Sequence, residues 1–126
     1  MSGVEVRGLY ELIEDVREFP REEADGARKV VQQSCKRIKA EWRLRWTGYE
    51  HLPHLPNSVT YETHEEGMTF SGVVGPERRR PQGTLGPIIE FGTIHNAPIP
   101  GMMPAMDAEE PRFTKAVADI RTRLMG

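Results

Sequence analysis

One apolar stripe between residues 20 and 46 constrains the fold of this chain more than any other feature. Its members recur every three or four positions: Ala24, Ala27, Val31, Cys35, Ile38, Trp42 and Trp46. This spacing places them on one face of an α-helix, and the positions between them are strongly charged. We therefore expect a long amphipathic helix from Pro20 or Arg21 to Trp46, which Thr47 and Gly48 end.

The second half of this helix carries a basic surface. It contains Lys36, Arg37, Lys39, Arg43 and Arg45. Cations near a helix C-terminus interact favourably with the negative end of the helix dipole. One interpretation is therefore a solvated face. Contact with DNA or with an acidic neighbouring subunit is the other. Cys35 lies on the apolar stripe, which indicates a core thiol.

A shorter helix is predicted before the long one, over residues 4–17. Leu9, Leu12, Ile13 and Val16 recur at helical spacing, with charged residues on the other faces. Phe19-Pro20 ends this helix, because the residue before a proline avoids helical geometry.

Two strands forming an antiparallel hairpin are expected next, over residues 58–63 and 68–74. Both are rich in β-branched and aromatic residues, and residues 64–67 form a turn with Gly67 at positive φ. A lone hairpin is marginal in water. It must therefore pack on the long helix, or gain strands from elsewhere in the chain or from a neighbour.

A basic loop follows the second strand, which Gly75-Pro76 ends. Arg78, Arg79 and Arg80 stand between two prolines. A solvated, mobile loop is one interpretation, and contact with phosphates or acidic groups is the other, since guanidinium groups bind phosphate without base specificity.

The most unusual stretch covers residues 86–113 and centres on Glu90, Phe91 and Gly92. Gly92 can adopt positive φ, so a tight reversal is predicted there with Phe91 as its anchor. Three prolines, Pro98, Pro100 and Pro104, make residues 97–103 a stiff, non-helical arm. Because the arm carries Ile99, Met102 and Met103, it must lie on its own core or on a neighbouring subunit.

The chain is expected to end in a helix that Asp107 and Glu110 begin as a capping box, with Pro111 in its first turn. Its apolar face is Phe113, Ala116, Val117, Ile120 and Leu124. The predicted order is two N-terminal helices, one of them long, an antiparallel hairpin or small sheet, a turn and arm, and a C-terminal helix. This is an α+β fold.

Composition narrows the class of protein further. The 126 residues fit a single domain, 1–126, and a hydrophobic content of 37% with mean hydropathy of -0.56 suits a chain that completes its burial in an assembly. The net charge of -2 makes no overall case for nucleic acid. One cysteine excludes an internal disulfide. We find no membrane span and no signal-peptide core, and expect a soluble protein.

No catalytic motif is recognisable, so an enzyme and a small-molecule substrate are not expected. His51 and His54 lie in a segment, 51–56, whose two prolines argue against regular structure, and no third metal ligand accompanies them. Glu90 has an apolar, glycine-flanked setting. It could act as a base, but more often such a glutamate caps a backbone or pairs with an arginine.

The string Glu90-Phe91-Gly92-Thr93, followed by Pro98 and by residues 104–108 entering a helix, resembles a family of small tailed-phage neck proteins. These are head-to-tail connector, tail-completion or minor tail components, found also in prophages and gene transfer agents. Thr47-Gly48 and residues 55–59 resemble a second, weaker signature of the family. Two features depart from it: Ile99 stands where an aromatic usually follows the proline, and residues 48–56 are longer than expected.

The resemblance implies a structural virion protein that forms a ring at the head-to-tail junction and completes the tail. A hexamer would be expected, located in the virion and in host cytoplasm during assembly, with head-completion or connector proteins and tail-terminator or tail-tube proteins as neighbours and without a cofactor. Its interface residues would be Glu90, Phe91, Gly92, Thr93, Pro98, Ile99, Met103 and Pro104, and Arg78, Arg79 and Arg80 could meet packaged DNA. The alternative is a small nucleic-acid-binding or regulatory protein that uses these arginines and the basic helix face.

Overall fold

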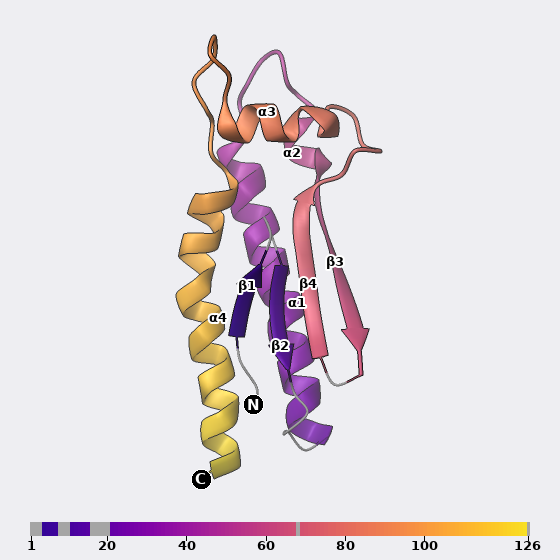
Figure 1. Cartoon of the computed structure of the whole chain (residues 1–126), viewed down its shortest axis with the longest axis vertical. Coiled ribbons are helices and arrows are strands. Elements are labelled where there is room, and N and C mark those ends of the chain that lie inside the picture. The colour runs from indigo at the N-terminus through magenta and orange to yellow at the C-terminus, as the bar shows by residue number, and fades with distance from the viewer. Residues whose placement is uncertain (1–3, 8–10, 16–20, 68, 126) are drawn as a thin grey trace.

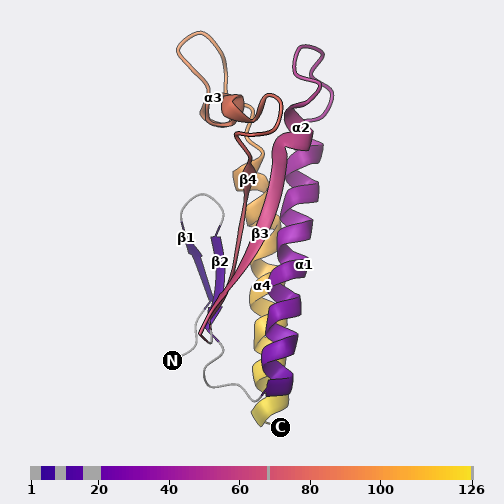
Figure 2. The same ribbon diagram turned by 90° about the vertical axis from the view of Figure 1, so that its right-hand side faces the viewer.

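The computed structural model describes residues 4–7, 11–15, 21–67 and 69–125. The elements follow in the order β1 (Val4–Arg7), β2 (Glu11–Asp15), α1 (Arg21–Arg45), α2 (Leu55–Ser58), β3 (Val59–Glu66), β4 (Thr69–Pro76), a 3-10 turn η1 (Gly83–Leu85), α3 (Gly86–Phe91) and α4 (Met102–Met125). Helices α1 and α4 run antiparallel along the long axis of the molecule, and the sheet forms a second layer against them (Figures 1 and 2). The predicted α+β class is confirmed.

The described strands form one antiparallel sheet in the order β1-β2-β4-β3. The predicted hairpin is its β3–β4 half. Strand β3 continues to Glu66, which pairs with Thr69, so the turn is tighter than the predicted 64–67. Gly67 has a φ of 59°, in the left-handed region that favours glycine.

The predicted N-terminal helix is wrong, because its described residues form strands β1 and β2. Strand β2 pairs with the edge of β4 that β3 leaves open, from Glu11 opposite Val73 to Asp15 opposite Thr69. This pairing satisfies the backbone hydrogen-bonding groups along β4. It is a long-range interaction, so the local periodicity of the sequence does not reveal it. Leu9, Val16 and the predicted helix end at 19–20 lie outside the described residues, as does Pro20 as the start of α1.

The apolar stripe of α1 forms the core, as predicted. Its members from Ala27 onward are buried, with Ile38, Trp42 and Trp46 at 0% exposure; the side chain of Ala24 lies outside the described part. Gly72 on β4 faces this stripe, and a Cβ built there would lie 2.2 Å from the Cys35 sulfur. Glycine at this position therefore lets the sheet approach the helix closely.

Helix α4 packs lengthwise beside α1 in the same layer (Figures 1 and 2). Phe113, Val117 and Ile120 are buried and Ala116 is half-buried, as their spacing predicts; the Leu124 side chain lies outside the described part. Glu109 is also buried, and its Oε1 accepts hydrogen bonds from Ser34 Oγ at 3.1 Å and Arg37 Nη1 at 3.2 Å. A buried carboxylate so bonded joins the two long helices across their interface.

Two predicted boundaries are wrong. Helix α4 begins at Met102, so Asp107 is not its N-cap and Pro111 lies inside the helix. The physical reason is that the carboxylate of Glu90, which is remote in sequence, accepts hydrogen bonds from the N–H groups of Gly101 and Met102 and so caps the helix at this point. Helix α2 begins at Leu55, inside the segment expected to be irregular, because a proline is tolerated in a first helical turn.

None of the helices in the described part of the chain is both long and apolar enough to cross a membrane.

Candidate functional site

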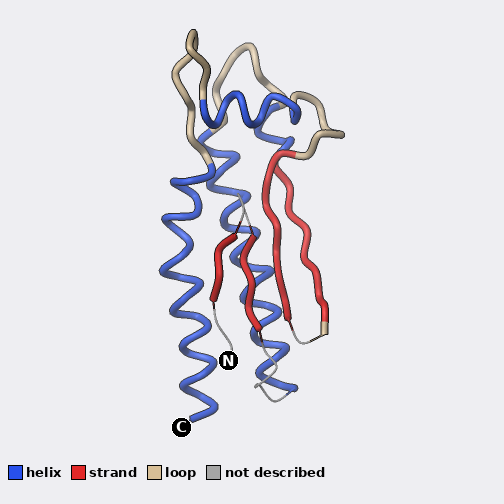
Figure 3. Tube along the Cα trace, in the orientation of Figure 1, coloured by secondary structure: helices blue, strands red, loops and turns tan. Residues whose placement is uncertain are grey.

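Three connections gather at one end of the molecule, which we call the apex. They are residues 46–54, 77–82 and 92–101, and they surround the short helices α2 and α3 (Figures 1 and 3). We call residues 92–101 the apical loop. The apex thus brings together the Glu90 motif, the arginine loop and the histidine segment, which are far apart in sequence.

Helix α3 was missed by the sequence reasoning, although two signals mark it. Pro87 occupies its first turn, where a proline is well tolerated, and Gly92 follows its last residue with a φ of 74°. The N–H of Gly92 donates to the Ile88 carbonyl at 2.8 Å and closes the helix. The predicted reversal at Gly92 is therefore confirmed, and it follows a short helix that was not predicted.

Glu90 caps helix α4 from outside that helix. Its side chain is buried, at 4% exposure. The N–H of Gly101 donates to its two oxygens at 3.0 and 3.1 Å, and the N–H of Met102 donates to them at 3.0 and 3.2 Å. A negative charge at a helix N-terminus satisfies free donors and complements the helix dipole. The interpretation of Glu90 as a backbone cap within the domain is confirmed.

The cap closes the apical loop onto the body of the protein at two further points. The N–H of Ile99 donates to the Ile89 carbonyl at 2.8 Å, and the indole N–H of Trp46 donates to the Ile99 carbonyl at 2.8 Å. A Cβ on Gly101 would lie 2.4 Å from Trp42 Cδ1. The second half of the loop is therefore held between α3 and two tryptophans, Trp42 in α1 and Trp46 just after it.

The outer half of the apical loop is a compact turn. The N–H of Thr93 donates to the Asn96 carbonyl at 2.9 Å, and Thr93 Oγ1 accepts from the backbone N–H groups of His95 and Asn96 at 3.2 and 3.1 Å. A Cβ on Gly92 would lie 2.7 Å from the Pro98 nitrogen. Glycine is thus required by both the φ angle and the lack of space, and the turn is rigidly built.

The predicted interface residues take different places in this arrangement. Phe91 is 58% exposed, so the prediction that it anchors the reversal is wrong; buried Glu90 does so. Ile99 packs half-buried against the core, and Pro104 is half-buried in the first turn of α4. The exposed members are Phe91, Thr93, Pro98 and Met103.

Two apolar residues of the apex that the prediction did not name are also exposed. Ile88 on α3 is 50% exposed and Ile94 in the apical loop is 95% exposed. A usable signal was present, because residues 91–106 contain no Asp, Glu, Lys or Arg in a chain that is 29% charged. Exposed apolar residues that lie together in an uncharged segment are a signal of an interaction site.

A groove lies where α3 meets the end of the β3–β4 hairpin. It has a volume of about 520 Å³, and its apolar lining includes Pro87 and Phe91 of α3 and Val73 of β4. Glu62, Glu77 and Arg78 contribute its charged groups. The groove therefore combines a largely apolar floor with a few charges.

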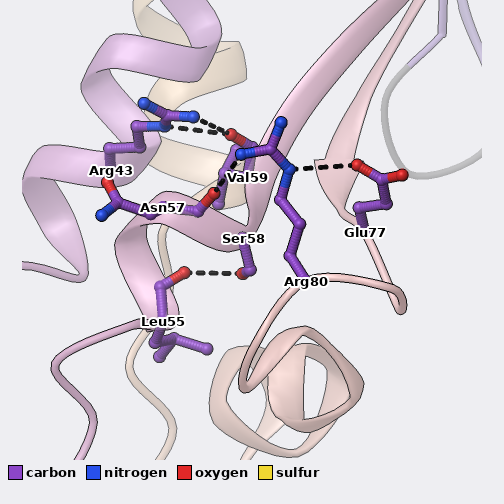
Figure 4. A network of polar contacts seen from close by, with 7 residues as sticks. All are labelled: Arg43, Leu55, Asn57, Ser58, Val59, Glu77 and Arg80. Carbon is purple, nitrogen blue, oxygen red and sulfur yellow. Dashed lines mark hydrogen bonds and ion pairs between the residues drawn. The ribbon is translucent and has the colours of Figure 1, made fainter.

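The arginine loop is partly fastened to the protein. Arg80 Nε donates to Glu77 Oε2 at 3.1 Å and its Nη1 donates to the Asn57 carbonyl at 3.4 Å (Figure 4). Arg78 and Arg79 are exposed. Of the three arginines, these two are therefore the better placed to meet another molecule.

Much of the basic face of α1 also has internal partners. Arg43 donates from Nε and Nη2 to the Val59 carbonyl at 2.9 and 2.8 Å (Figure 4), and Arg37 bonds Glu109. Lys39 lies over the Tyr61 ring at 5.1 Å, and burial, followed by repulsion from neighbouring cations, lowers the pKa of Lys39. These contacts favour a structural role for much of this face.

The two histidines of the apex connect loops through their backbones. The N–H of His54 donates to Gln82 Oε1 at 2.8 Å, and Gln82 Nε2 donates to the His51 carbonyl at 3.4 Å. Within residues 21–67 and 69–125 and the two N-terminal strands, no three His, Cys, Asp or Glu side chains are grouped to hold a metal ion.

Comparison of the chain with models of protein families, with curated proteins and with solved structures finds no match. Function is therefore inferred from the motif in the sequence and from the geometry of the apex.

Proposed function

We propose that this chain is a structural subunit of a ring at the head-to-tail junction of a tailed phage or phage-like particle. The observation that carries the proposal is the way in which the Glu-Phe-Gly-Thr motif is folded. The order and spacing of this motif and its flanking residues resemble those of phage neck proteins. Its carboxylate is buried as a helix cap, whereas its aromatic ring is exposed beside an uncharged loop. Such a motif fixes a surface for contact with another protein.

The proposed mechanism is assembly. Each subunit presents a preorganised apical loop, so little conformational entropy is lost when it meets a neighbour. Contacts between different faces of identical subunits close into a ring when the rotation between them closes. A hexamer completes the tail and joins it to the head, between a head-completion or connector ring and a tail-terminator or tail-tube ring.

The test is electron microscopy of particles from the producing system that carry Phe91→Ala. Because Phe91 is 58% exposed, we expect the variant to keep the fold. Thermal unfolding of the purified protein checks this. Filled heads separated from tails are the expected result. Leu44→Ala is the matched control, since Leu44 is an exposed apolar residue, at 67%, on α1. Normal yields of joined particles from both Phe91→Ala and a gene deletion would contradict the proposal.

Nucleic-acid binding is the second candidate, and the exposure of Arg78 and Arg79 favours it. Binding through phosphates weakens steeply as ionic strength rises. The test is the affinity of the purified chain for double-stranded DNA over a range of salt, with Arg78→Glu/Arg79→Glu as the comparison. A lack of binding at low salt, or equal binding by the variant, removes this candidate.

A further inference from the structure

The apex carries an apolar projection and an apolar groove on different surfaces. We propose that Ile94 of one subunit enters the groove between α3 and the β3–β4 hairpin of a second copy of the chain. This lateral contact rests on the proposed ring function, and it identifies the two surfaces that meet in the ring.

The projection is built to stay in place. Ile94 lies within the turn that begins at Thr93. Three hydrogen bonds to Thr93 Oγ1 hold this turn, and the backbone of Gly92 lies close to Pro98. At 95% exposure, Ile94 makes almost no use of its apolar surface within its own chain. A large aliphatic side chain at the tip of a rigid turn gains free energy only when another molecule covers it.

The groove has the size and the lining to receive it. Its volume of about 520 Å³ lies in the range of sites that enclose small ligands, so there is room for Ile94 together with a neighbouring side chain. Val73 and Phe91 line it and are 40% and 58% exposed. Entry of an aliphatic group would cover both of these surfaces.

Charge favours a second copy of this chain as the occupant. Glu62, Glu77 and Arg78 line the groove, so a charged segment entering it would meet repulsion or lose solvation. The apical loop brings no carboxylate, lysine or arginine, and its one ionisable side chain, His95, is adjacent to Ile94. The uncharged loop thus matches the largely apolar lining of the groove in polarity.

The two surfaces also have the relation that a ring requires. The groove is lined by residues of α3 and of the β3–β4 hairpin. The apical loop projects beyond α3 at the end of the molecule (Figures 1 and 2). A contact between two different surfaces leaves one of each free on every pair, so a further copy can add until the ring closes. A symmetric dimer could instead place each Ile94 in the groove of the other copy, which would leave neither surface free, so the double-cysteine variant described below would stop at a dimer.

Disulfide trapping between engineered cysteines tests this geometry in the purified protein. One preparation carries Ile94→Cys and another carries Val73→Cys, and they are mixed at high protein concentration under mild oxidation. Cys35 is fully buried and does not compete. Thr122→Cys, an exposed position near the other end of α4, replaces Val73→Cys in the control mixture.

The expected product is the mixed disulfide between positions 94 and 73, at several times the yield of either homodimer and of the control. A double variant with both cysteines should give a ladder of covalent oligomers that stops at the ring. Yields equal to the control, or a predominant disulfide that joins position 94 of two copies, would overturn the proposal. So would a product, in assembled particles, that joins the cysteine of Val73→Cys only to a different protein.

A second variant separates this contact from folding and from the proposed function. Ile94→Asp, at a position so exposed, keeps the fold and should lower self-association, followed by the concentration dependence of sedimentation, by roughly tenfold or more. Ile94→Asp with unchanged self-association contradicts the lateral contact. Loss of joined particles on gene deletion, measured separately, would still support the junction role.

Discussion

Replacing Glu90 with alanine should destabilise the protein more than any substitution of an exposed carboxylate in α4. The carboxylate is 4% exposed and accepts from two backbone N–H groups, those of Gly101 and Met102. Its removal leaves both donors inside the protein without their acceptor. The variant also loses a negative charge at the positive end of α4.

The magnitude follows from these losses. Each buried donor left unpaired costs about 1 to 3 kcal/mol, so we expect Glu90→Ala to lower the free energy of unfolding by about 2 to 6 kcal/mol in total. For a chain of 126 residues this corresponds to a fall in Tm of roughly 10 to 20 °C. Glu90→Gln keeps one oxygen that can accept from both N–H groups, but it replaces the other oxygen with an NH2 donor and loses the charge, so about 1 to 2 kcal/mol is expected.

The assay is urea unfolding followed by far-ultraviolet circular dichroism, with linear extrapolation to water. Asp107→Ala and Glu110→Ala are the controls, because both carboxylates are exposed and together they form the capping pattern that the sequence suggests. Each control should stay within about 0.5 kcal/mol of the parent protein. If Asp107→Ala costs more than Glu90→Ala, α4 begins where the local pattern places it, and the reasoning from the remote cap is refuted.

Two further predictions concern the apical loop and the core. Gly92→Ala should cost about 2 kcal/mol or more in unfolding free energy, because it combines a φ of 74° with a Cβ 2.7 Å from the Pro98 nitrogen. Gly48→Ala should cost about 1 kcal/mol, since Gly48 has a φ of 97° but nothing within 4 Å of a Cβ, and equal costs would contradict the role assigned to the clash. Burial raises the pKa of the Cys35 thiol to about 12, so the reactive thiolate is scarce in the folded protein at mildly alkaline pH. A thiol reagent should label Cys35 only as fast as the protein opens, and labelling at the rate of the unfolded chain would show that the thiol is accessible.

The long helix and the β3–β4 hairpin could be predicted because their signals are local. The stripe from Ala27 to Trp46 and the β-branched runs around Gly67 each carry a period that matches one element, and the core is made largely of those residues. The two N-terminal strands could not be predicted in this way. The spacing of Leu12 and Ile13 fits a helical face. These residues form a strand because they pair with the edge of β4 that β3 leaves open.

The candidate site shows the same division between local and remote causes. Gly92 was predicted from its conformational freedom and Glu90 from its apolar setting, and both take part in fixing the apical loop. The start of α4 was predicted at the wrong place because Asp107 and Glu110 form a plausible local cap. The carboxylate that caps the helix belongs to Glu90, which lies eleven and twelve residues before the N–H groups from which it accepts hydrogen bonds. Exposure of Phe91 could not be read from its residue type, since aromatic residues occur both in cores and at interfaces.

The short sequence distance between Glu90 and the residues it caps has a consequence for folding kinetics. The hydrogen bond to Gly101 closes a loop of eleven residues, whereas the bond from Ser34 to Glu109 joins positions 75 residues apart. Closing the smaller loop costs less chain entropy and takes less time. We therefore expect the apex to re-form quickly after a local opening, while pairing of α1 with α4 sets the slower rate at which the whole chain folds.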